Sequence, residues 1–485
     1  MAINISAPAI INNIMTTQLD LEELKLNIDD MFLVINGIIV SLMQVGFACL
    51  EAGCVQPKNV TNIMMKNILD LFLCAISYWL VGYGLAYGGG GCGYYGKEYF
   101  AGVDMPSSQK GVWFFQYVFA ATAATIISGA VAERCNFIAY IFYSVIISGV
   151  TYPIVSHWTW SPDGWLMKIG YSDFSGAGTV HMLAGTCSFI AALFIGPRNG
   201  RFSTIAPNEY NGHSMPLVAT GTLLLITGFL SFNGASLGHI TRPGDGVIVA
   251  NSVANTIFGG SGAAVTILIL AKAGLVGESR WPFAMTINAV LNGIVSVCGG
   301  VNEYTHLSAM MVGMIGCIIY LVLQWIIPRL KVDDPLETTA VHFGGGLWGV
   351  IATPLFVKGG FWNNPDSMPL LKSNLIGAGS IIVWSVVNSA ILFGFLKVFD
   401  LLRVSTDTEI IGLDMSLHKE QAYPVTNISI ENGHKSNKTT VIRHAYDNVA
   451  MQHTLQKSST DHNGGPLEGK LALYTYPYNI QLSMD

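Results

Sequence analysis

The sequence predicts an all-α polytopic membrane protein with about eleven transmembrane helices, because long apolar runs recur along most of its length. Hydrophobic residues make up 51% of the 485 residues and charged residues only 11%, whereas soluble domains carry about 25% charged residues. Runs long enough to cross a bilayer repeat from Met31 to about Leu402. This composition excludes a soluble globular fold. The mild net charge of -6 gives no sign of a nucleic-acid partner.

The expected spans are separated mostly by short loops. They cover about residues 31–54, 62–88, 111–131, 136–156, 178–196, 216–236, 247–271, 281–300, 305–327, 339–357 and 374–402. Lysine and arginine favour one set of alternate loops, as at Lys58, Arg134 and Arg198. Because positively charged loops stay in the cytoplasm, this bias predicts an outside N terminus and a cytoplasmic C terminus. No basic stretch precedes an apolar core in the first 30 residues, so we expect the first span to act as the anchor.

These spans predict three regions. Residues 1–30 are expected to form an extracellular N-terminal segment, residues 31–402 the transmembrane domain, and residues 403–485 a cytoplasmic C-terminal tail. Within the transmembrane domain, repeat one covers about residues 31–197, repeat two about 216–357 and a final helix about 374–402. The tail is polar in composition and is predicted to be mostly disordered after about residue 424.

An internal repeat marks a candidate site. The segments from Asp173 to Gly185 (DFSGAGTVHMLAG) and from Asp334 to Gly346 (DPLETTAVHFGGG) each place a histidine, His181 or His342, eight residues after an aspartate. They fall in expected spans that cross the membrane in opposite directions, as in the inverted repeats of transporters. An ionisable side chain in hydrocarbon is costly, so two repeat-equivalent histidines indicate a functional site near the midplane. For the two aspartates, helix capping is favoured over direct contact with an ion.

Several segments resemble one known family. The run from Asp173 to Arg198 (DFSGAGTVHMLAGTCSFIAALFIGPR) is similar to the signature of the ammonium transporter family (Amt/Mep/Rh), and departs from it at Ser175, where alanine is commoner. Further matches are GFACLEAG from Gly46 with KN at Lys58, GAVAER from Gly129, SFNGAS from Ser231 and VDDP from Val332. The resemblance, to the animal or plant-like Amt branch, covers about residues 30–420. It implies an eleven-helix inverted-repeat fold, assembled as a homotrimer with one pore in each subunit.

The resemblance also implies roles for individual residues. They are pore histidines at His181 and His342, gating phenylalanines at Phe119 and Phe232, and an external ammonium-recruitment site at Trp160, Ser236 and Asp173, with Trp158 as a competitor for Trp160. Ammonium is attracted to an indole face and can donate to a hydroxyl. A bare cation crosses an apolar constriction at high cost, so we expect loss of a proton near the phenylalanines and passage of ammonia between the histidines. Whether the proton follows by a relay stays open.

The tail segment from Asp407 to Pro424 (DTEIIGLDMSLHKEQAYP) resembles the ordered part of the family's tail, which contacts the neighbouring subunit. Ser416 falls where plant relatives carry a phosphorylatable threonine, and phosphate would add negative charge there. Regulation through Ser416 is therefore a hypothesis. The implied partners are ammonium or ammonia, the lipid bilayer of the plasma membrane, and copies of the chain. Asn4 begins a glycosylation sequon whose use the sequence leaves open.

Two other functions remain open from the residues alone. The first is an ammonium sensor that signals through the C-terminal tail. The second is an intramembrane metalloenzyme that uses His181 and His342, although no nearby Glu-His or Cys ligands complete a metal site. The eight cysteines show neither a disulfide framework nor zinc-ligand spacing. We therefore expect no metal, no cofactor and no enzyme activity.

Overall fold

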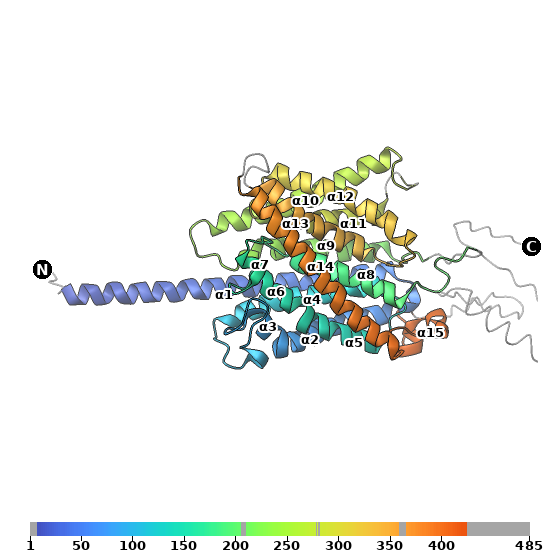
Figure 1. Ribbon diagram of the computed structural model, residues 1–485, viewed down its shortest axis with the longest axis horizontal. Helices are drawn as coiled ribbons and strands as arrows, with labels where there is room; N and C mark the ends of the chain where they lie inside the picture. Colours follow the sequence, from blue (N-terminus) through green and yellow to red (C-terminus); the bar gives the residue numbers. More distant parts are fainter. Residues whose placement is uncertain (1–6, 205–209, 278, 280–281, 358–364, 424–485) are drawn as a thin grey trace, which may run out of the picture. The chain divides into compact units, whose positions relative to one another are not determined.

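The computed structural model describes residues 7–204, 210–277, 279, 282–357 and 365–423. Within these ranges the chain is helical, with two isolated β-bridges and no β-strand. Nine helices in this described part are long and apolar enough to cross a membrane. All of them belong to one unit, Met1–Thr426 (Figure 1). The sequon at Asn4 and the expected disordered tail after residue 424 lie outside the described residues.

The helices of the first half follow the apolar runs of the sequence. They are α1 (Ala7–Cys54), α2 (Val60–Ser77) with η2 (Tyr78–Gly82) and α3 (Tyr83–Tyr87), α4 (Gln109–Ala130), α5 (Phe137–Ile146) with η4 (Ile147–Thr151) and α6 (Tyr152–Trp160), and η5 (Ala177–Met182) with α8 (Leu183–Ile195). α1 begins much earlier than the expected start near Met31. Residues 18–27 are rich in Leu and Glu, which favour helix, so the helix continues there although most of these side chains are exposed.

The second half continues in the same way. Its helices are α9 (Met215–Gly234), α10 (Asp245–Lys272), α11 (Phe283–Val297), α12 (His306–Arg329), η7 (Thr339–Gly344) with α13 (Gly345–Phe356), and α14 (Ser367–Val398). α11 has only 15 residues and is not among the nine long helices. Side chains cap helix ends where the chain must turn: Thr305 accepts a hydrogen bond from the backbone N–H of Ser308 at 3.1 Å.

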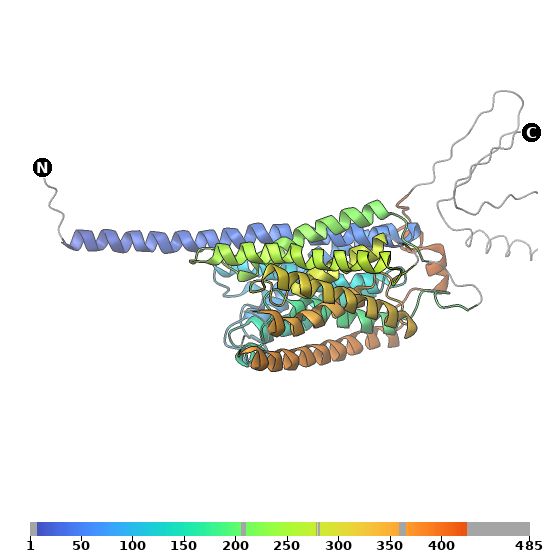
Figure 2. The ribbon, with the colours of Figure 1, turned by 90° about the horizontal axis from the view of Figure 1, so that it is seen from above.

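Glycines let the helices approach closely. α1 packs along α9, and the two helices lie side by side while α14 lies on the opposite side of the unit (Figure 2). A Cβ atom at Gly221 would lie 2.4 Å from the Leu50 nitrogen, and one at Gly46 would lie 2.8 Å from the Leu225 nitrogen. Lipid supplies no hydrophobic force between helices, so this close contact of backbones is what holds them together.

A buried charged layer lies where the loops after α4, α8 and α12 meet. Arg198 contacts Glu133 at 2.5 Å and Asp333 at 2.8 Å, and all three side chains are at most 5% exposed. Arg134 donates to the Asp333 carbonyl oxygen at 2.6 Å. Burial raises the pKa of Asp333, but the hydrogen bonds and charge of Arg198 outweigh it and hold that pKa at about 2. These arginines, expected as loop charges, therefore join separate loops into one structure.

The ordered part of the C-terminal segment docks on its own chain. It contains α15 (Thr406–Ile411) and η9 (Asp414–His418). Asp414 accepts hydrogen bonds from the backbone N–H groups of Thr61 at 3.0 Å and Asn62 at 2.9 Å, which caps the start of α2. Glu409 accepts from the backbone N–H of Asn199 at 2.6 Å. The segment is therefore anchored on its own subunit, and the expected contact with a neighbouring subunit stays a prediction.

Candidate functional site

The two histidines of the internal repeat meet inside the helix bundle. The His181 and His342 side chains are 0% and 6% exposed, and their Nδ1 atoms lie 3.2 Å apart. The rings are nearly parallel, with centroids 5.3 Å apart and planes inclined by 19°. Two neutral imidazoles can share only one hydrogen between two Nδ1 atoms, so one ring donates and the other accepts. Nε2 of His181 is buried and has no hydrogen-bond partner within the described part of the chain.

Each histidine is carried by a short π-helical turn that an aspartate caps. Asp173 accepts four backbone N–H groups at 2.7–3.0 Å, that of Gly176 just before η5 and those of the first three residues of η5. Asp334 accepts the backbone N–H groups of Thr338 at 3.1 Å and Thr339 at 2.7 Å at the start of η7. These contacts agree with the capping role favoured for both aspartates. A π-turn is less tightly wound than an α-helix and is common at functional positions.

Equivalent glycines in α8 and α13, just after the two π-turns, each pack against the opposite turn. Gly185 and Gly346 each lie four residues after their histidine. A Cβ atom at Gly185 would lie 2.2 Å from the nitrogen of Phe343 in η7, and one at Gly346 would lie 2.5 Å from the nitrogen of Met182 in η5. Neither position has room for a side chain, and this reciprocal contact keeps the two histidine segments together.

On one side of the histidine pair, aromatic side chains continue the stack of rings. Phe232 lies 5.6 Å from His181 between ring centroids, and it stacks on Phe119 at 3.9 Å with planes inclined by 13°. Phe119 in turn meets Trp160 edge to face at 6.2 Å. The five rings of Trp160, Phe119, Phe232, His181 and His342 therefore form one continuous row, in which the phenylalanine pair separates the tryptophan from the histidines.

A cavity of about 240 Å³, which we call the Trp160 cavity, lies beyond the phenylalanines. It is lined by Tyr87, Phe115, Gln116, Phe119, Trp160, Phe174 and Ser236. Trp160 Nε1 donates to the Asp173 carbonyl oxygen at 2.7 Å, which fixes the indole. The Ser236 hydroxyl donates to the Phe232 carbonyl oxygen at 2.7 Å, so its oxygen can still accept. Aromatic faces and acceptor oxygens suit a small cation with N–H groups.

The sequence-predicted recruitment residues therefore separate into two groups. Trp160 and Ser236 line the Trp160 cavity, whereas the Asp173 carboxylate points into the backbone that it caps and is not among the lining residues. Trp158, the competitor for Trp160, donates to the Tyr94 carbonyl oxygen at 3.0 Å and packs against Trp384. It does not line this cavity either.

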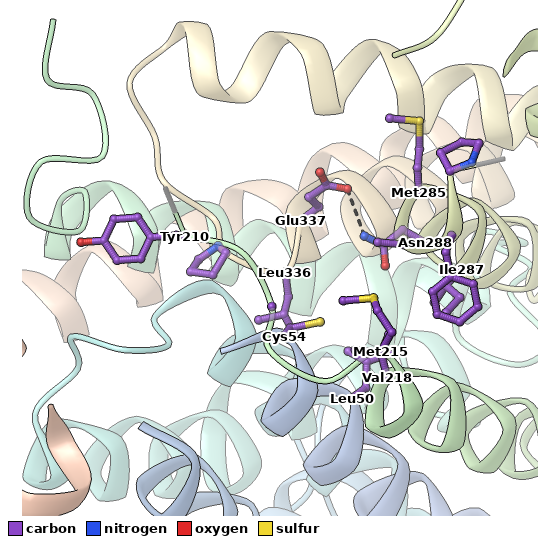
Figure 3. Close-up of a pocket in the computed structure, with 15 residues that line it drawn as sticks. Leu50, Cys54, Tyr210, Met215, Val218, Met285, Ile287, Asn288, Leu336 and Glu337 are labelled. Carbon is purple, nitrogen blue, oxygen red and sulfur yellow. Dashed lines mark hydrogen bonds between the residues drawn. The ribbon is translucent and has the colours of Figure 1, made fainter. Parts of the chain in front are cut away.

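On the other side of the histidines, two neighbouring cavities are each lined by residues that include a glutamate. A small cavity of about 20 Å³, the Glu51 cavity, is lined by residues that include His342 and Glu51. A larger one of about 400 Å³, the Glu337 cavity, shares Leu50, Asn288 and Leu336 with it (Figure 3). Glu337 accepts a hydrogen bond from Asn288 at 3.0 Å, as the dashed line shows (Figure 3). The row of rings thus joins a cavity without carboxylates to cavities that contain them.

Sequence reasoning missed most of the lining residues. Tyr87, Phe115, Gln116 and Phe174 of the Trp160 cavity carry no local signal that separates them from other membrane aromatics and amides. Glu51 did carry one, because it is an acidic residue within the apolar run 31–54. No group of three His, Cys, Asp or Glu side chains that could hold a metal occurs among the described residues. All eight cysteines are free.

The many apolar helices around a buried row of rings define the class of protein, a multi-pass helical membrane protein. The model of the Ammonium Transporter Family matches residues 31–423. The chain belongs to the ammonium transporter family.

Comparisons with individual proteins agree with this assignment. The chain is 41% identical over 428 residues to putative ammonium transporter 1 of Caenorhabditis elegans, covering 82% of this chain and 79% of that one. It is 35% identical over 432 residues to ammonium transporter 1 member 3 of Solanum lycopersicum, covering 82% and 93%. These relatives are named as transporters rather than enzymes.

Solved structures show the same fold. A sensor Amt protein superposes with a TM-score of 0.76 at 32% identity, covering 82% of this chain and 99% of that one. Candida albicans Mep2 superposes with a TM-score of 0.70 at 22% identity, covering 79% and 87%. The second likeness concerns the fold alone.

Proposed function

We propose that the chain carries ammonium or ammonia across the plasma membrane along the row of rings. The observation that supports this proposal most directly is the continuity of the row from Trp160 to His342, with a cavity at each end. Membership of the ammonium transporter family supports ammonium as the substrate. The alternative of an intramembrane metalloenzyme lacks a third ligand near the histidine pair in the part of the chain that the structure describes.

Recruitment takes place in the Trp160 cavity. Ammonium lies against the Trp160 indole, held by cation-π attraction of about 0.5–2 kcal/mol, and donates to the Ser236 oxygen. Asp173 acts indirectly, because its carbonyl oxygen holds the indole N–H and its carboxylate caps η5. The stacked pair Phe119 and Phe232 offers no polar atom to a passing cation. Ammonium therefore gives a proton to solvent water on the Trp160 side, and neutral ammonia enters the histidine pair.

The histidine pair replaces the hydrogen bonds that ammonia loses on leaving water. Ammonia has one lone pair and three N–H groups, so it can accept from one ring nitrogen and donate to another. Nε2 of His181, buried without a partner among the described residues, is available for this contact. Because the two Nδ1 atoms share one hydrogen, the tautomers of His181 and His342 are linked. A proton relay through the pair would make transport electrogenic.

The topology proposed for this function has eleven spans, which adds α11 and the η7–α13 segment to the nine long helices. The extracellular segment is 1–30, the two inverted repeats are about 31–197 and 216–357, and the cytoplasmic tail begins at 403. Equivalent capped π-turns and reciprocal glycine contacts support the repeat. The Trp160 cavity faces outside and the Glu337 cavity the cytoplasm. A homotrimer, with a pore in each subunit, is the proposed assembly.

The transport proposal is tested by reconstituting the purified chain in liposomes on a supported membrane and applying an ammonium jump, with and without a membrane potential. We expect flux above that of empty liposomes. A current would indicate net charge movement, and flux without current would indicate neutral ammonia. Absence of any flux would leave the sensor alternative, which the likeness to a sensor Amt protein at 32% identity favours.

Ser416 is proposed as a regulatory site. Its side chain is exposed on η9, and Asp414 of the same turn caps α2. A phosphate on Ser416 would place negative charge next to Asp414 and loosen that cap. Ser416→Asp is expected to change flux at equal surface expression, with Ser416→Ala as the control. Equal flux for the native chain and both variants would remove this role.

A further inference from the structure

The Glu51 cavity has the size of its expected occupant. Its volume of about 20 Å³ exceeds the roughly 10–15 Å³ that one water molecule requires. Ammonia is close to water in size. His342 and Glu51 line the cavity together, and most of its other lining residues are apolar. A molecule that leaves His342 on this side therefore enters a cavity that Glu51 also lines.

The hydrogen bonds of Glu51 can be satisfied with a proton on its carboxyl. Asn67 donates its Nδ2 hydrogen to Glu51 Oε2 at 2.7 Å. The Ser128 oxygen lies within hydrogen-bond distance of both Glu51 Oε1 and the Thr125 carbonyl oxygen, the latter at 2.7 Å. A hydroxyl has one hydrogen and a carbonyl oxygen can only accept. Both contacts are satisfied when Ser128 donates to Thr125 and a protonated Glu51 donates to Ser128.

The charges around Glu51 also favour a bound proton on one of the buried carboxyls. Glu51, Lys66 and Asp70 are each at most 1% exposed and interact electrostatically with one another. Two carboxylates and one ammonium group would carry a net charge of about -1 in a nonpolar setting, which is costly. One carboxyl of the pair is neutral at lower cost. Asp70 accepts from Tyr140 and Ser144, which favours the ionised form there.

We propose that Glu51 exchanges a proton with ammonia in the cavity next to His342, an assignment that rests on the proposed transport function. The O–H bond of the carboxyl breaks, a new N–H bond forms on the ammonia lone pair, and an ammonium ion faces a carboxylate. Hydronium from the solvent then returns a proton to the carboxylate and leaves water. The ammonium ion departs through the Glu337 cavity, where a second carboxylate attracts it.

The other titratable groups near Glu51 come from several elements and define the controls. They are Cys54 on α1, Lys66 and Asp70 on α2, His342 on η7 and Glu337 just before η7. Asp70→Asn removes the other carboxyl of the buried group but leaves the residue that lines the cavity. Glu51→Gln keeps the size and an acceptor oxygen but cannot exchange a proton. Glu51→Asp keeps the acid one methylene further from the cavity.

The first measurement does not depend on flux. An infrared difference spectrum of the reconstituted chain on ammonium addition is expected to show loss of a protonated carboxyl band. The band should be absent in Glu51→Gln and present, shifted, in Glu51→Asp; the Asp70→Asn variant should retain it. A band that persists in a folded Glu51→Gln variant, or no band in the native chain, would overturn the assignment.

The second measurement is the pH profile of ammonium flux in liposomes. General acid-base groups typically raise a rate 10²–10⁴-fold. We therefore expect the flux of Glu51→Gln to be at least about tenfold lower, and its pH profile to lack one ionisation step that the native profile shows. Glu51→Asp should keep the step. Native flux and an unchanged profile in Glu51→Gln would contradict the role. If the native chain carries no ammonium while the infrared band responds to it, the transport function fails and the assignment of Glu51 as an ammonia-facing acid stands.

Discussion

The two ends of the ring row differ in how they can hold a cation. The Trp160 cavity offers aromatic faces, an amide and a hydroxyl, and no carboxylate among the described residues lines it. The cavities beyond His342 offer Glu51 and Glu337. Ring faces attract ammonium without binding a proton, whereas a carboxyl can also give or take one. The comparison places ammonium recognition at the Trp160 end, and carboxyls that can return a proton beyond the histidine pair.

The boundary between the two ends depends on the reciprocal glycines, and changing one should have the largest effect. A Cβ at Gly185 would clash with the Phe343 backbone, and such overpacking costs about 1–3 kcal/mol or more. We expect Gly185→Ala to lower the unfolding temperature and to reduce ammonium flux at least tenfold. A free-energy change of about 1.4 kcal/mol already corresponds to a factor of ten. Gly379→Ala in α14, where a Cβ would meet nothing within 4 Å, is the matched control. A Gly185→Ala variant with native stability and flux would contradict this packing.

The substitution Trp160→Leu tests whether Trp160 takes part in ammonium recognition. Loss of about 0.5–2 kcal/mol of cation-π attraction should raise the ammonium concentration for half-maximal flux by about twofold to thirtyfold, with a smaller change in maximal flux. Trp158→Phe is the control, since Trp158 lies outside the Trp160 cavity. Flux titrations at fixed pH measure both. An equal change of the half-maximal ammonium concentration in the two variants would contradict a specific role of Trp160 in recognition.

The charged layer near the C-terminal segment should give a smaller, pH-dependent effect on stability. The pKa of Asp333 falls from 3.8 to about 2 in the fold, a difference worth about 2 kcal/mol. Because the folded value is depressed, this stabilisation is present above about pH 4 and is lost as the pH falls toward 2. Thermal unfolding in detergent from pH 6 to pH 3 should show the loss in the native chain and a flatter profile in Asp333→Asn. Parallel pH profiles of the unfolding temperature in the native chain and Asp333→Asn would contradict this role of the Asp333 carboxylate.

Hydropathy predicted the position of the helices well, because span length and composition are properties of the chain itself. It placed the end of α1 at Cys54 but not its start at Ala7, since the acidic residues between 18 and 30 interrupt the apolar run without ending the helix. The repeat also predicted that His181 and His342 belong to one site, and their rings do meet.

The sequence did not predict contacts that depend on which faces of two helices pack together. The π-turns, the contact of Gly185 with Phe343 and the docking of Asp414 on α2 each join segments far apart in the sequence. Glu51 was visible as an acid in an apolar run, but only packing places it beside His342. The roles of the phenylalanine pair and of Trp160 stay predictions.

The central claim is that neutral ammonia, and not a bare cation, passes Phe119, Phe232 and the histidine pair. The most direct test compares ammonium and potassium fluxes in the same liposomes, because potassium has a similar size and charge but cannot lose a proton. The native chain should carry ammonium and exclude potassium, and Phe232→Ala should weaken that exclusion. Potassium flux through the native chain at a rate similar to that of ammonium would contradict the account.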